Sequence, residues 1–439
     1  MYRIYENRVQ EWIDNSRKAL LIYGARQVGK TWLIREMLER NKINYSEINL
    51  LERPDILKML ESTDDSSEIS TRLALYSEKE LKEGESVIFL DEIQKYPDIV
   101  TKIKFLVDEG RFRYILSGSN LGVELKGIRS IPVGYIDEWQ MMPMNFEEFA
   151  KATGVTVAQL EHTKACIREG KPVDEIIHKK LISTFYYYLV VGGMPAVVNV
   201  FNRTQNLDEI DKEQKSIVNQ YKADFTRYEQ EDKKLKVRSV YENIPSQLDK
   251  QNRRFTFTLL DRELKFDRYE DSFLWLKDAA VAIPSYIVSV PRSPLKISSE
   301  TNVFRLFMSD VGLLVSCYPM FTKRKLLEMD PEKEINNGAL FENFVAQEIC
   351  AAGLDPYYYK KSKIGEVDFI IEREDGVVPI EVKSGSDYKK HAALDNLLEK
   401  ESFKEVYVLS TNNIEKDNGI NYYPIYAAGM ICRSAETVV

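Results

Sequence analysis

The chain has 439 residues, of which 44% are hydrophobic and 30% are charged, so we expect two or three domains with full cores. The formal net charge of −8 argues against a general polyanion binder, so any nucleic-acid contact must use a local patch. Isolated cysteines and histidines argue against disulfides, a zinc site and a Ser/His/Asp triad, and favour a reducing cytoplasm. They are Cys166, Cys317, Cys350, Cys432, His162, His178 and His391.

A phosphate-binding loop is the first motif with chemistry. Residues 24–31, GARQVGKT, fit the pattern G-x-x-x-x-G-K-[ST] between an apolar run at 19–23 and a predicted helix at 31–38. The glycines allow backbone N–H groups to surround phosphate oxygens. Lys30 is predicted to reach the β- and γ-phosphates of ATP, and Thr31 to ligate Mg²⁺. The predicted nucleotide-binding residues are Gly24, Ala25, Arg26, Gln27, Val28, Gly29, Lys30 and Thr31.

The next strand supplies acidic groups for the same site. Residues 87–90 are continuously apolar, which is typical of a strand buried on both faces of a parallel sheet. Asp91 at its carboxyl end is predicted to bind the metal, directly or through water, and Glu92 to polarise the attacking water. Alone, this pair would indicate only a solvated strand end, but the upstream phosphate loop favours the functional interpretation.

A third strand at 112–116 ends in the small polar residues 117–120. Side chains there can hydrogen-bond the γ-phosphate or the lytic water. Their position resembles that of the polar sensor in AAA-type ATPases, and that resemblance assigns the role to Ser119 or Asn120.

Two patterns divide the first three quarters of the chain. Strands and helices alternate through 1–165, which predicts a parallel α/β sheet with helices on both faces. From 135 to 330 the helical period dominates, with a short hairpin predicted near 281–298, and this combination fits a winged-helix-like domain. The mildly basic stretch 222–268 is interpreted as a solvated helical face, with contact to a phosphate backbone as the alternative.

Two segments bear on membrane association. The N-terminal 12 residues are too polar and charged for a signal peptide. The uncharged stretch 181–202 contains Gly192, Gly193 and Pro195, which favours a buried helix followed by a turn over a membrane span. We therefore expect a cytoplasmic protein without membrane contact.

Charged residues interrupt a predicted apolar hairpin near the C-terminus, after a predicted helix at 339–349. Period-two alternation places Glu381 and Lys383 on one face of their strand. Asp368 lies in the preceding strand, and ionised groups in such strands are costly unless they pair or bind a metal. Asp368 and Glu381, completed by Glu342, are predicted to hold Mg²⁺ or Mn²⁺, and Lys383 to stabilise a scissile phosphate or orient water. The alternative is a surface hairpin with a cross-strand ion pair.

The order of a helix with Glu342, then Asp368, then Glu381-x-Lys383 resembles that of PD-(D/E)xK nucleases. Over nearly its whole length, the chain resembles prokaryotic AAA-type ATPases with a C-terminal restriction-endonuclease-like domain. The resemblance rests on GARQVGKT, FLDEIQ, LSGSN, PMNFEEF, GGMP, WLKDA, MSDVGLL, FENFVAQEI and PIEVKSG. It implies an AAA-type P-loop ATPase domain with a helical lid at 1–200, a winged-helix-like domain at 201–332 and a nuclease-like α/β domain at 333–439.

One departure from that family concerns an arginine. The family commonly has Gly-Arg before the P-x-x-F-E-E-F stretch, where this chain has Gly134 and Tyr135. A role at the γ-phosphate is then vacant or moves to another arginine. The candidates are Arg129, Arg111, Arg113 and Arg26. Slow hydrolysis, or an oligomer in which a partner subunit assists, is the expected consequence.

Two functions fit the sequence. The first is an ATPase whose nucleotide state controls a DNA-directed and nucleolytic C-terminal domain. The second is an ATP-driven regulatory switch, in which a degenerate nuclease-like domain binds a protein or nucleic acid without cutting. Residues 360–390 carry equal numbers of basic and acidic residues, so no strong electrostatic footprint for DNA is present, and this slightly favours the second.

Overall fold

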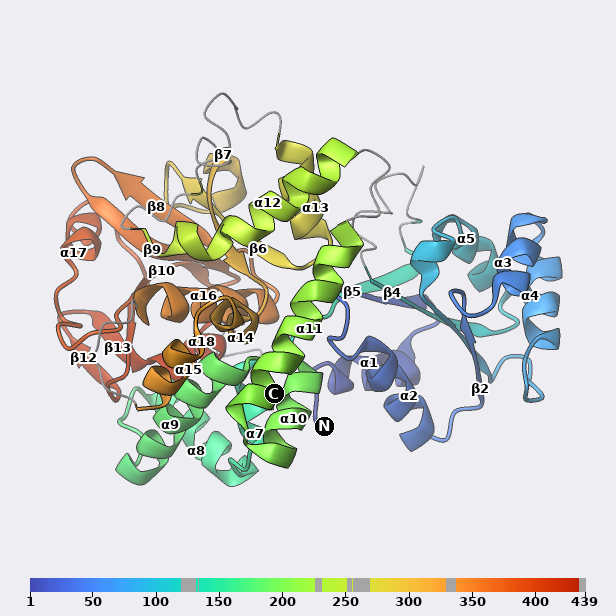
Figure 1. Cartoon of the computed structure of the whole chain (residues 1–439), viewed down its shortest axis with the longest axis horizontal. Helices are drawn as coiled ribbons and strands as arrows, with labels where there is room; N and C mark the ends of the chain where they lie inside the picture. Colours follow the sequence, from blue (N-terminus) through green and yellow to red (C-terminus); the bar gives the residue numbers. More distant parts are fainter. Residues whose placement is uncertain are drawn as a thin grey trace. The chain divides into compact units, whose positions relative to one another are not determined.

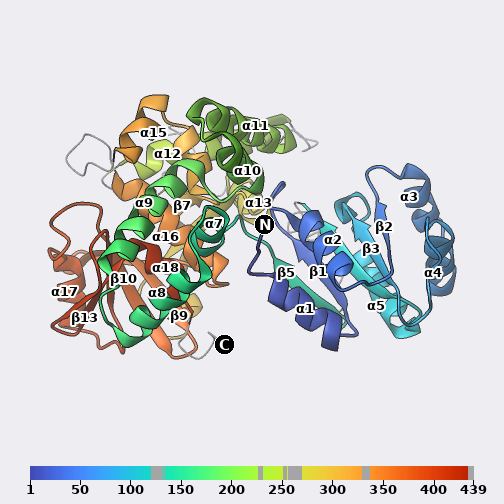
Figure 2. The ribbon, with the colours of Figure 1, turned by 90° about the horizontal axis from the view of Figure 1, so that it is seen from below.

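The computed structural model describes residues 1–119, 132, 134–225, 231–250, 255, 269–328 and 337–433. The chain forms two compact units, whose elements are labelled in Figures 1 and 2. The first unit comprises Met1–Met142 and Asp278–Ala280, and the second comprises Pro143–Lys277 and Val281–Val439.

The first unit contains a parallel sheet of five strands in the order β2-β3-β4-β1-β5. The strands are β1 (Ala19–Tyr23), β2 (Tyr45–Asn49), β3 (Val87–Asp91), β4 (Arg113–Gly118) and β5 (Ile136–Gln140). The helices are α1 (Glu6–Asn15), α2 (Lys30–Arg40), α3 (Pro54–Glu61), α4 (Ser66–Leu75) and α5 (Ile99–Glu109), with the short η1 (Ile93–Lys95) after β3. The predicted parallel α/β sheet is confirmed. Because all strands run the same way, the segments that follow β1, β3 and β4 meet at one edge.

Leucines of the three central strands pack into the hydrophobic core of this unit. Leu21, Leu90 and Leu116 of β1, β3 and β4 are fully buried in one cluster with Leu73 of α4 and Ile103 of α5. Burial of each such side chain stabilises the fold by about 1.5–3 kcal/mol. The strand ends that carry the predicted site therefore rest on rigidly packed strands.

The second unit contains a mixed sheet of eight strands in the order β12-β13-β11-β10-β9-β8-β6-β7. The strands are β6 (Ala282–Val288), β7 (Ser299–Met308), β8 (Tyr357–Lys361), β9 (Gly365–Arg373), β10 (Gly376–Val382), β11 (Tyr407–Ser410), β12 (Glu415–Asp417) and β13 (Ile420–Pro424). The α-helices are α7 (Phe146–Ala152), α8 (Val157–Glu169), α9 (Glu175–Val191), α10 (Pro195–Thr204), α11 (Leu207–Phe225), α12 (Glu231–Leu248), α13 (Glu270–Asp278), α14 (Val311–Ser316), α15 (Met320–Leu327), α16 (Asn337–Ala351), α17 (Ala392–Leu398) and α18 (Ala428–Ile431). Short 3₁₀ turns are η5 (Leu295–Ser298) and η6 (Ile425–Ala427).

The hairpin predicted near 281–298 differs from the one observed. Its strands, β6 and β7, extend to Met308, and β6 pairs in parallel with β8. The hairpin therefore belongs to the eight-stranded sheet. Within the hairpin alone, one edge of β6 would have unpaired backbone N–H and C=O groups, and β8, which is distant in the sequence, pairs with them. Apart from Asp278–Ala280, the predicted spans 201–332 and 333–439 both lie in this unit, and both contribute strands to this sheet.

Two of the sequence landmarks meet in a buried turn of the second unit. A Cβ on Gly193 would lie 2.0 Å from the Met144 carbonyl oxygen, so only glycine fits there. The Gly193 N–H donates to Asp310 Oδ2 at 2.6 Å, and Leu313 N–H donates to Asp310 Oδ1 at 2.9 Å. Asp310 thus caps α14 and holds the glycine turn, which explains the GGMP and MSDVGLL segments as packing residues.

Two further landmarks form an aromatic cluster. The ring of Phe146 on α7 contacts those of Tyr188 on α9, Phe344 on α16 and Tyr426 in η6, with centroids 6.0–6.2 Å apart. Asn145 and Glu148 form a capping box at the start of α7. The PMNFEEF and FENFVAQEI segments therefore fix helix contacts within this unit.

Within the described residues, no single helix is long and apolar enough to cross a membrane. The pair α9 and α10 passes that test only when taken together, and the two helices are bent by 117° at the break.

A buried acid on α16 generates a prediction about stability. Glu348 is 2% exposed and accepts a hydrogen bond from Phe146 N–H at 2.8 Å. Burial raises the pKa of Glu348 from its ordinary value of 4.5 to about 8. The folded state therefore retains this proton up to about pH 8, whereas the unfolded chain loses it near the ordinary pKa of 4.5.

We predict that the free energy of unfolding falls as pH rises across that interval, by on the order of 1.4 kcal/mol per pH unit from this group. In Glu348→Gln the contribution should disappear, because the amide oxygen still accepts from Phe146 without a proton to release. Denaturant unfolding from pH 4.5 to 8 measures the difference, with the surface change Glu161→Gln as control. Equal pH slopes for Glu348→Gln and wild type would show that Glu348 is ionised in the folded state.

Candidate nucleotide site and carboxylate cavity

The phosphate loop joins β1 to α2. Gly24 has φ +151°, and a Cβ there would lie 2.3 Å from the carbonyl oxygen of Met141, the residue that follows β5. Gly29 is the left-handed N-cap of α2, with φ 98°. Lys30 Nζ donates to the carbonyl oxygens of Gly24 at 3.1 Å and Ala25 at 2.8 Å. The loop therefore closes around the buried lysine that the sequence assigns to the phosphates.

Burial lowers the pKa of Lys30 to about 8, although the nearby carboxylates of Glu92 and Asp91 oppose this shift. An anion such as a nucleotide phosphate favours the ammonium form of a buried lysine.

The phosphate loop is also held by an arginine that sequence analysis missed. Arg3 is 2% exposed, donates to the Val28 carbonyl, and donates to the Met142 carbonyl at 2.7 Å. No local pattern marks Arg3, because its partners lie 25 and 139 residues away.

The predicted magnesium residues are neighbours. Thr31 Oγ1 donates to Asp91 Oδ2 at 2.9 Å. Asp91 Oδ1 accepts from Ser117 Oγ and from Glu92 N–H, the latter at 3.0 Å. The described residues contain no cluster of three or more His, Cys, Asp or Glu side chains suited to a metal. Mg²⁺ bound with a nucleotide needs only one or two protein oxygens beside phosphates and waters, so Thr31 and Asp91 fit it.

The predicted water-activating residue is held by a side-chain network. Glu92 lies in the left-handed region, with φ 58° and ψ 40°, where β3 turns into η1. Gln94 Nε2 donates to Glu92 Oε2 and to Ser119 Oγ, the latter at 3.2 Å. Gln94 thus links Ser119, one of the two predicted sensor residues, to Glu92, whereas Asn120 lies outside the described residues.

The candidate transition-state arginines lie at different places in the structure. Arg113 lies at the amino end of β4, on the edge of the sheet away from the phosphate loop, and donates to the carbonyls of Trp12 and Ser16. Arg111 pairs with Glu83 and donates to Thr71. Both predictions are corrected, because these side chains are held by structural partners outside the site. Arg26 lies in the loop itself, and Arg129 is outside the described residues.

The predicted C-terminal residues come together in the second unit. A cavity of about 380 Å³ is lined by Glu342 of α16, Asp368 of β9, Glu381 of β10 and Lys383, with six further residues. Those residues are Gly338, Val382, Ser384, Gly385, Asp387 and Lys390. Asp368 and Glu381 are 8% and 6% exposed in adjacent strands of the sheet, so the alternative of a surface hairpin is wrong.

An arginine that sequence analysis missed pairs with two of these carboxylates. Arg305 of β7 is 1% exposed, and its Nη1 lies 3.3 Å from Glu342 Oε2 and 3.7 Å from Asp368 Oδ1. Its Nη2 pairs with Glu366. Burial opposes ionisation of Glu366, but Arg305 and Lys360 lower the pKa of this acid below its ordinary value. The cluster is therefore an ionic one with its own protein cation.

Glu381 differs from its neighbours. Its Oε1 accepts from Lys383 Nζ at 2.8 Å, while its buried Oε2 has no hydrogen-bond partner. Burial, followed by the charge of Asp368, raises the pKa of Glu381 to about 7, against the effect of Lys383. Since Arg305 already pairs with Glu342 and Asp368, the predicted three-carboxylate cage for Mg²⁺ or Mn²⁺ does not fit this arrangement. The described residues contain no such metal cluster.

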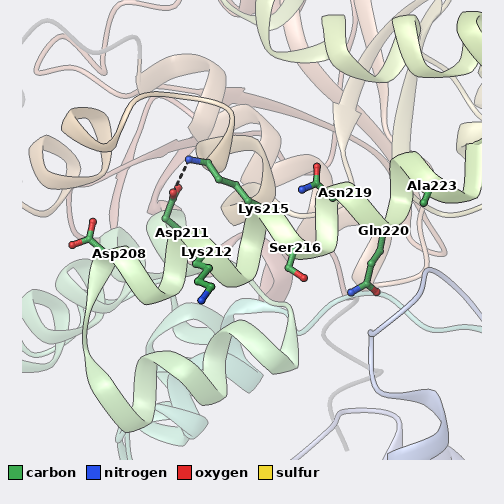
Figure 3. Close-up of a pocket in the computed structure, with 8 residues that line it drawn as sticks. All are labelled: Asp208, Asp211, Lys212, Lys215, Ser216, Asn219, Gln220 and Ala223. Carbon is green, nitrogen blue, oxygen red and sulfur yellow. Dashed lines mark ion pairs between the residues drawn. The ribbon is translucent and has the colours of Figure 1, made fainter.

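A groove of about 640 Å³ elsewhere in the second unit is a surface feature of α11 (Figure 3). Its lining residues all come from that helix: Asp208, Asp211, Lys212, Lys215, Ser216, Asn219, Gln220 and Ala223. Lys215 and Asp211 pair at 2.7 Å, and Lys323 also pairs with Asp211. The lining comes from one helix and Asp211 is already paired with two lysines, so we assign it no chemistry.

Comparison with known families agrees with the nucleotide site. Residues 16–150 match the family model of an AAA domain. Residues 182–324 and 337–428 match two domains of unknown function, DUF8612 and DUF4143 respectively. Curated proteins give no match.

Solved structures give distant similarities. A Walker-type ATPase of Pyrococcus abyssi is 16% identical, with a TM-score of 0.44, over 72% of this chain and 95% of that one. The RuvB Holliday junction branch migration motor of Thermotoga maritima is 11% identical, with a TM-score of 0.29, over 63% of this chain and 87% of that one. Scores this low carry no argument about function. The domain match and the loop geometry agree that residues 16–150 form an AAA-type P-loop ATPase domain, followed by two domains of unknown function.

Proposed function

We propose that this protein is a Mg²⁺-dependent ATPase that acts as a regulatory switch, and that its C-terminal domain binds a protein or nucleic-acid partner without cleaving it. The observation that carries the ATPase proposal is the joint placement of Lys30, the Thr31–Asp91 pair and Glu92 at one edge of the parallel sheet. The cytoplasm is the compartment that this proposal assumes.

Each residue has a separate role in the proposed reaction. The loop N–H groups and Lys30 bind the β- and γ-phosphates, and the positive N-terminal end of α2 adds to their attraction. Thr31 and Asp91 would hold Mg²⁺, which neutralises charge on the transferred phosphoryl group. Glu92 accepts a hydrogen bond from the attacking water and orients it toward the γ-phosphate. Ser119 is placed to hydrogen-bond the same region.

The C-terminal half of the proposal rests on Arg305. A buried guanidinium paired with Glu342 and Asp368 places a protein cation among the carboxylates that were predicted to bind a metal. Nucleolysis is the second candidate function, and a specific observation favours it. Asp368, Glu381 and Lys383 line one cavity, and Glu381 Oε2 has no hydrogen-bond partner.

Two variants test the ATPase site. Lys30→Ala should abolish ATP binding, because the buried ammonium and its fixed donors are lost. Glu92→Gln should bind ATP with nearly unchanged affinity but hydrolyse it about 10²–10⁴-fold more slowly, since the amide cannot act as a base. Calorimetric binding and phosphate-release assays measure both. Turnover in Glu92→Gln equal to wild type would exclude the proposed role of Glu92.

A cleavage assay separates the two functions of the C-terminal domain. Supercoiled and linear DNA are incubated with Mg²⁺ or Mn²⁺, with and without ATP, using wild type and Asp368→Ala. We expect no metal-dependent cleavage by either protein. Nicking by wild type that disappears in Asp368→Ala would overturn the switch proposal in favour of the nuclease.

Arg305 also makes the proposal testable through stability. Arg305→Met removes the buried cation and leaves the carboxylates of Glu342 and Asp368 uncompensated, so we expect a loss of about 3–5 kcal/mol in unfolding free energy. Arg292→Ala is the control, because Arg292 is 69% exposed and its pair with Glu401 contributes about 0–1 kcal/mol. Denaturant unfolding of the full chain measures both, and an Arg305→Met protein as stable as the control would refute the neutralising role.

A further inference from the structure

Gln94 is the last residue of the FLDEIQ segment and lies in the ATP site, but the sequence assigns it no role there. It lies two residues after Glu92, within η1, and is 8% exposed. Its amide nitrogen donates to Glu92 Oε2 and to Ser119 Oγ at 3.2 Å. Its amide oxygen accepts from the Ser119 N–H at 3.2 Å. One side chain thus joins the acidic residue that follows β3 to the polar residue that follows β4.

The backbone around Glu92 makes such a partner important. Glu92 adopts a left-handed conformation that is uncommon for residues with a Cβ, and it forms the whole turn between β3 and η1. The backbone therefore fixes the direction of the Cα–Cβ bond, but the rest of this long side chain keeps its rotatable bonds. The donated hydrogen bond from Gln94 occupies Oε2 and leaves Oε1 to accept from a water molecule.

We propose that Gln94 is a positioning residue for ATP hydrolysis, an inference that rests on the proposed ATPase function. Its amide fixes the Glu92 carboxylate beside Ser119, so that base and polar sensor face the attacking water together. A general base must lie within hydrogen-bond reach of the proton that it takes. A displacement of about 1 Å at such a site can cost about 10²-fold in rate.

The donor and the acceptor of this amide can be separated by substitution. Gln94→Glu keeps the shape of the side chain and an oxygen that accepts from the Ser119 N–H, but loses the donor to Glu92. Gln94→Ala loses both. Gln10→Glu makes the same chemical change on α1 of the same unit, where Gln10 contacts Asp14 and Asn41, and serves as the matched control.

The experiment measures steady-state hydrolysis of ATP by the full chain, binding of a non-hydrolysable ATP analogue, and the midpoint of thermal unfolding. We expect kcat to fall about 10- to 100-fold in both Gln94 variants. KM and analogue affinity should stay within about twofold of wild type, because the phosphate loop is untouched. Analogue binding also reports that the site is folded in each variant, and Gln10→Glu should match wild type throughout.

Different failures have different meanings. Normal kcat in Gln94→Glu together with a loss in Gln94→Ala would assign Gln94 only to support of the Ser119 backbone, and would overturn this inference. Normal kcat in both variants would overturn it as well, while leaving the ATPase proposal intact. A wild type that binds the analogue but does not hydrolyse ATP would overturn the ATPase proposal, and this role with it.

Discussion

The carboxylate of Asp91 is the contact on which the order of the nucleotide site depends. It is 4% exposed and accepts hydrogen bonds from Thr31 at the start of α2, from Ser117 near the end of β4, and from the Glu92 N–H. Leaving a buried carboxylate without donors is costly, so these contacts hold three chain segments at one sheet edge. The parallel order of the strands makes this possible, because β1, β3 and β4 are adjacent and end together.

In the second unit, buried carboxylates are stabilised by an arginine side chain. There the acids belong to adjacent strands and a facing helix, and the donor is Arg305 from a strand at the sheet edge. A planar guanidinium satisfies several carboxylates at once, which suits it to a buried cluster. It lies over the ring of Tyr358 at 4.7 Å, so packing on this ring also fixes its orientation. Glu381, beyond its reach, keeps one oxygen without a partner and has the raised pKa.

Sequence reasoning succeeded where chemistry depends on neighbouring residues. The phosphate loop, the buried strand before Asp91 and the mixed hairpin with Asp368 and Glu381 are local patterns, and the structure places each in the expected element. It failed where partners are distant. Arg3 donates to residues 25 and 139 positions away. Arg305 donates to residues 37 and 63 positions away. The extension of β6 and β7 into the large sheet likewise depends on a pairing with β8 that no periodicity encodes.

Gln94 illustrates a different limit, since it lies only two residues from Glu92. Its contacts with Ser119, which lies 25 residues later, use both the nitrogen and the oxygen of its side-chain amide, and no local pattern indicates them.

Like Gln94, Lys30 has hydrogen-bond partners within the protein, because it donates to the carbonyls of its own loop. Polar groups of the site thus have protein partners before nucleotide arrives, so binding exchanges one set of hydrogen bonds for another. The net gain then depends mainly on charge, since hydrogen bonds between charged groups are stronger than those from lysine to a carbonyl. A loop that is already curled also loses little conformational entropy when phosphate enters.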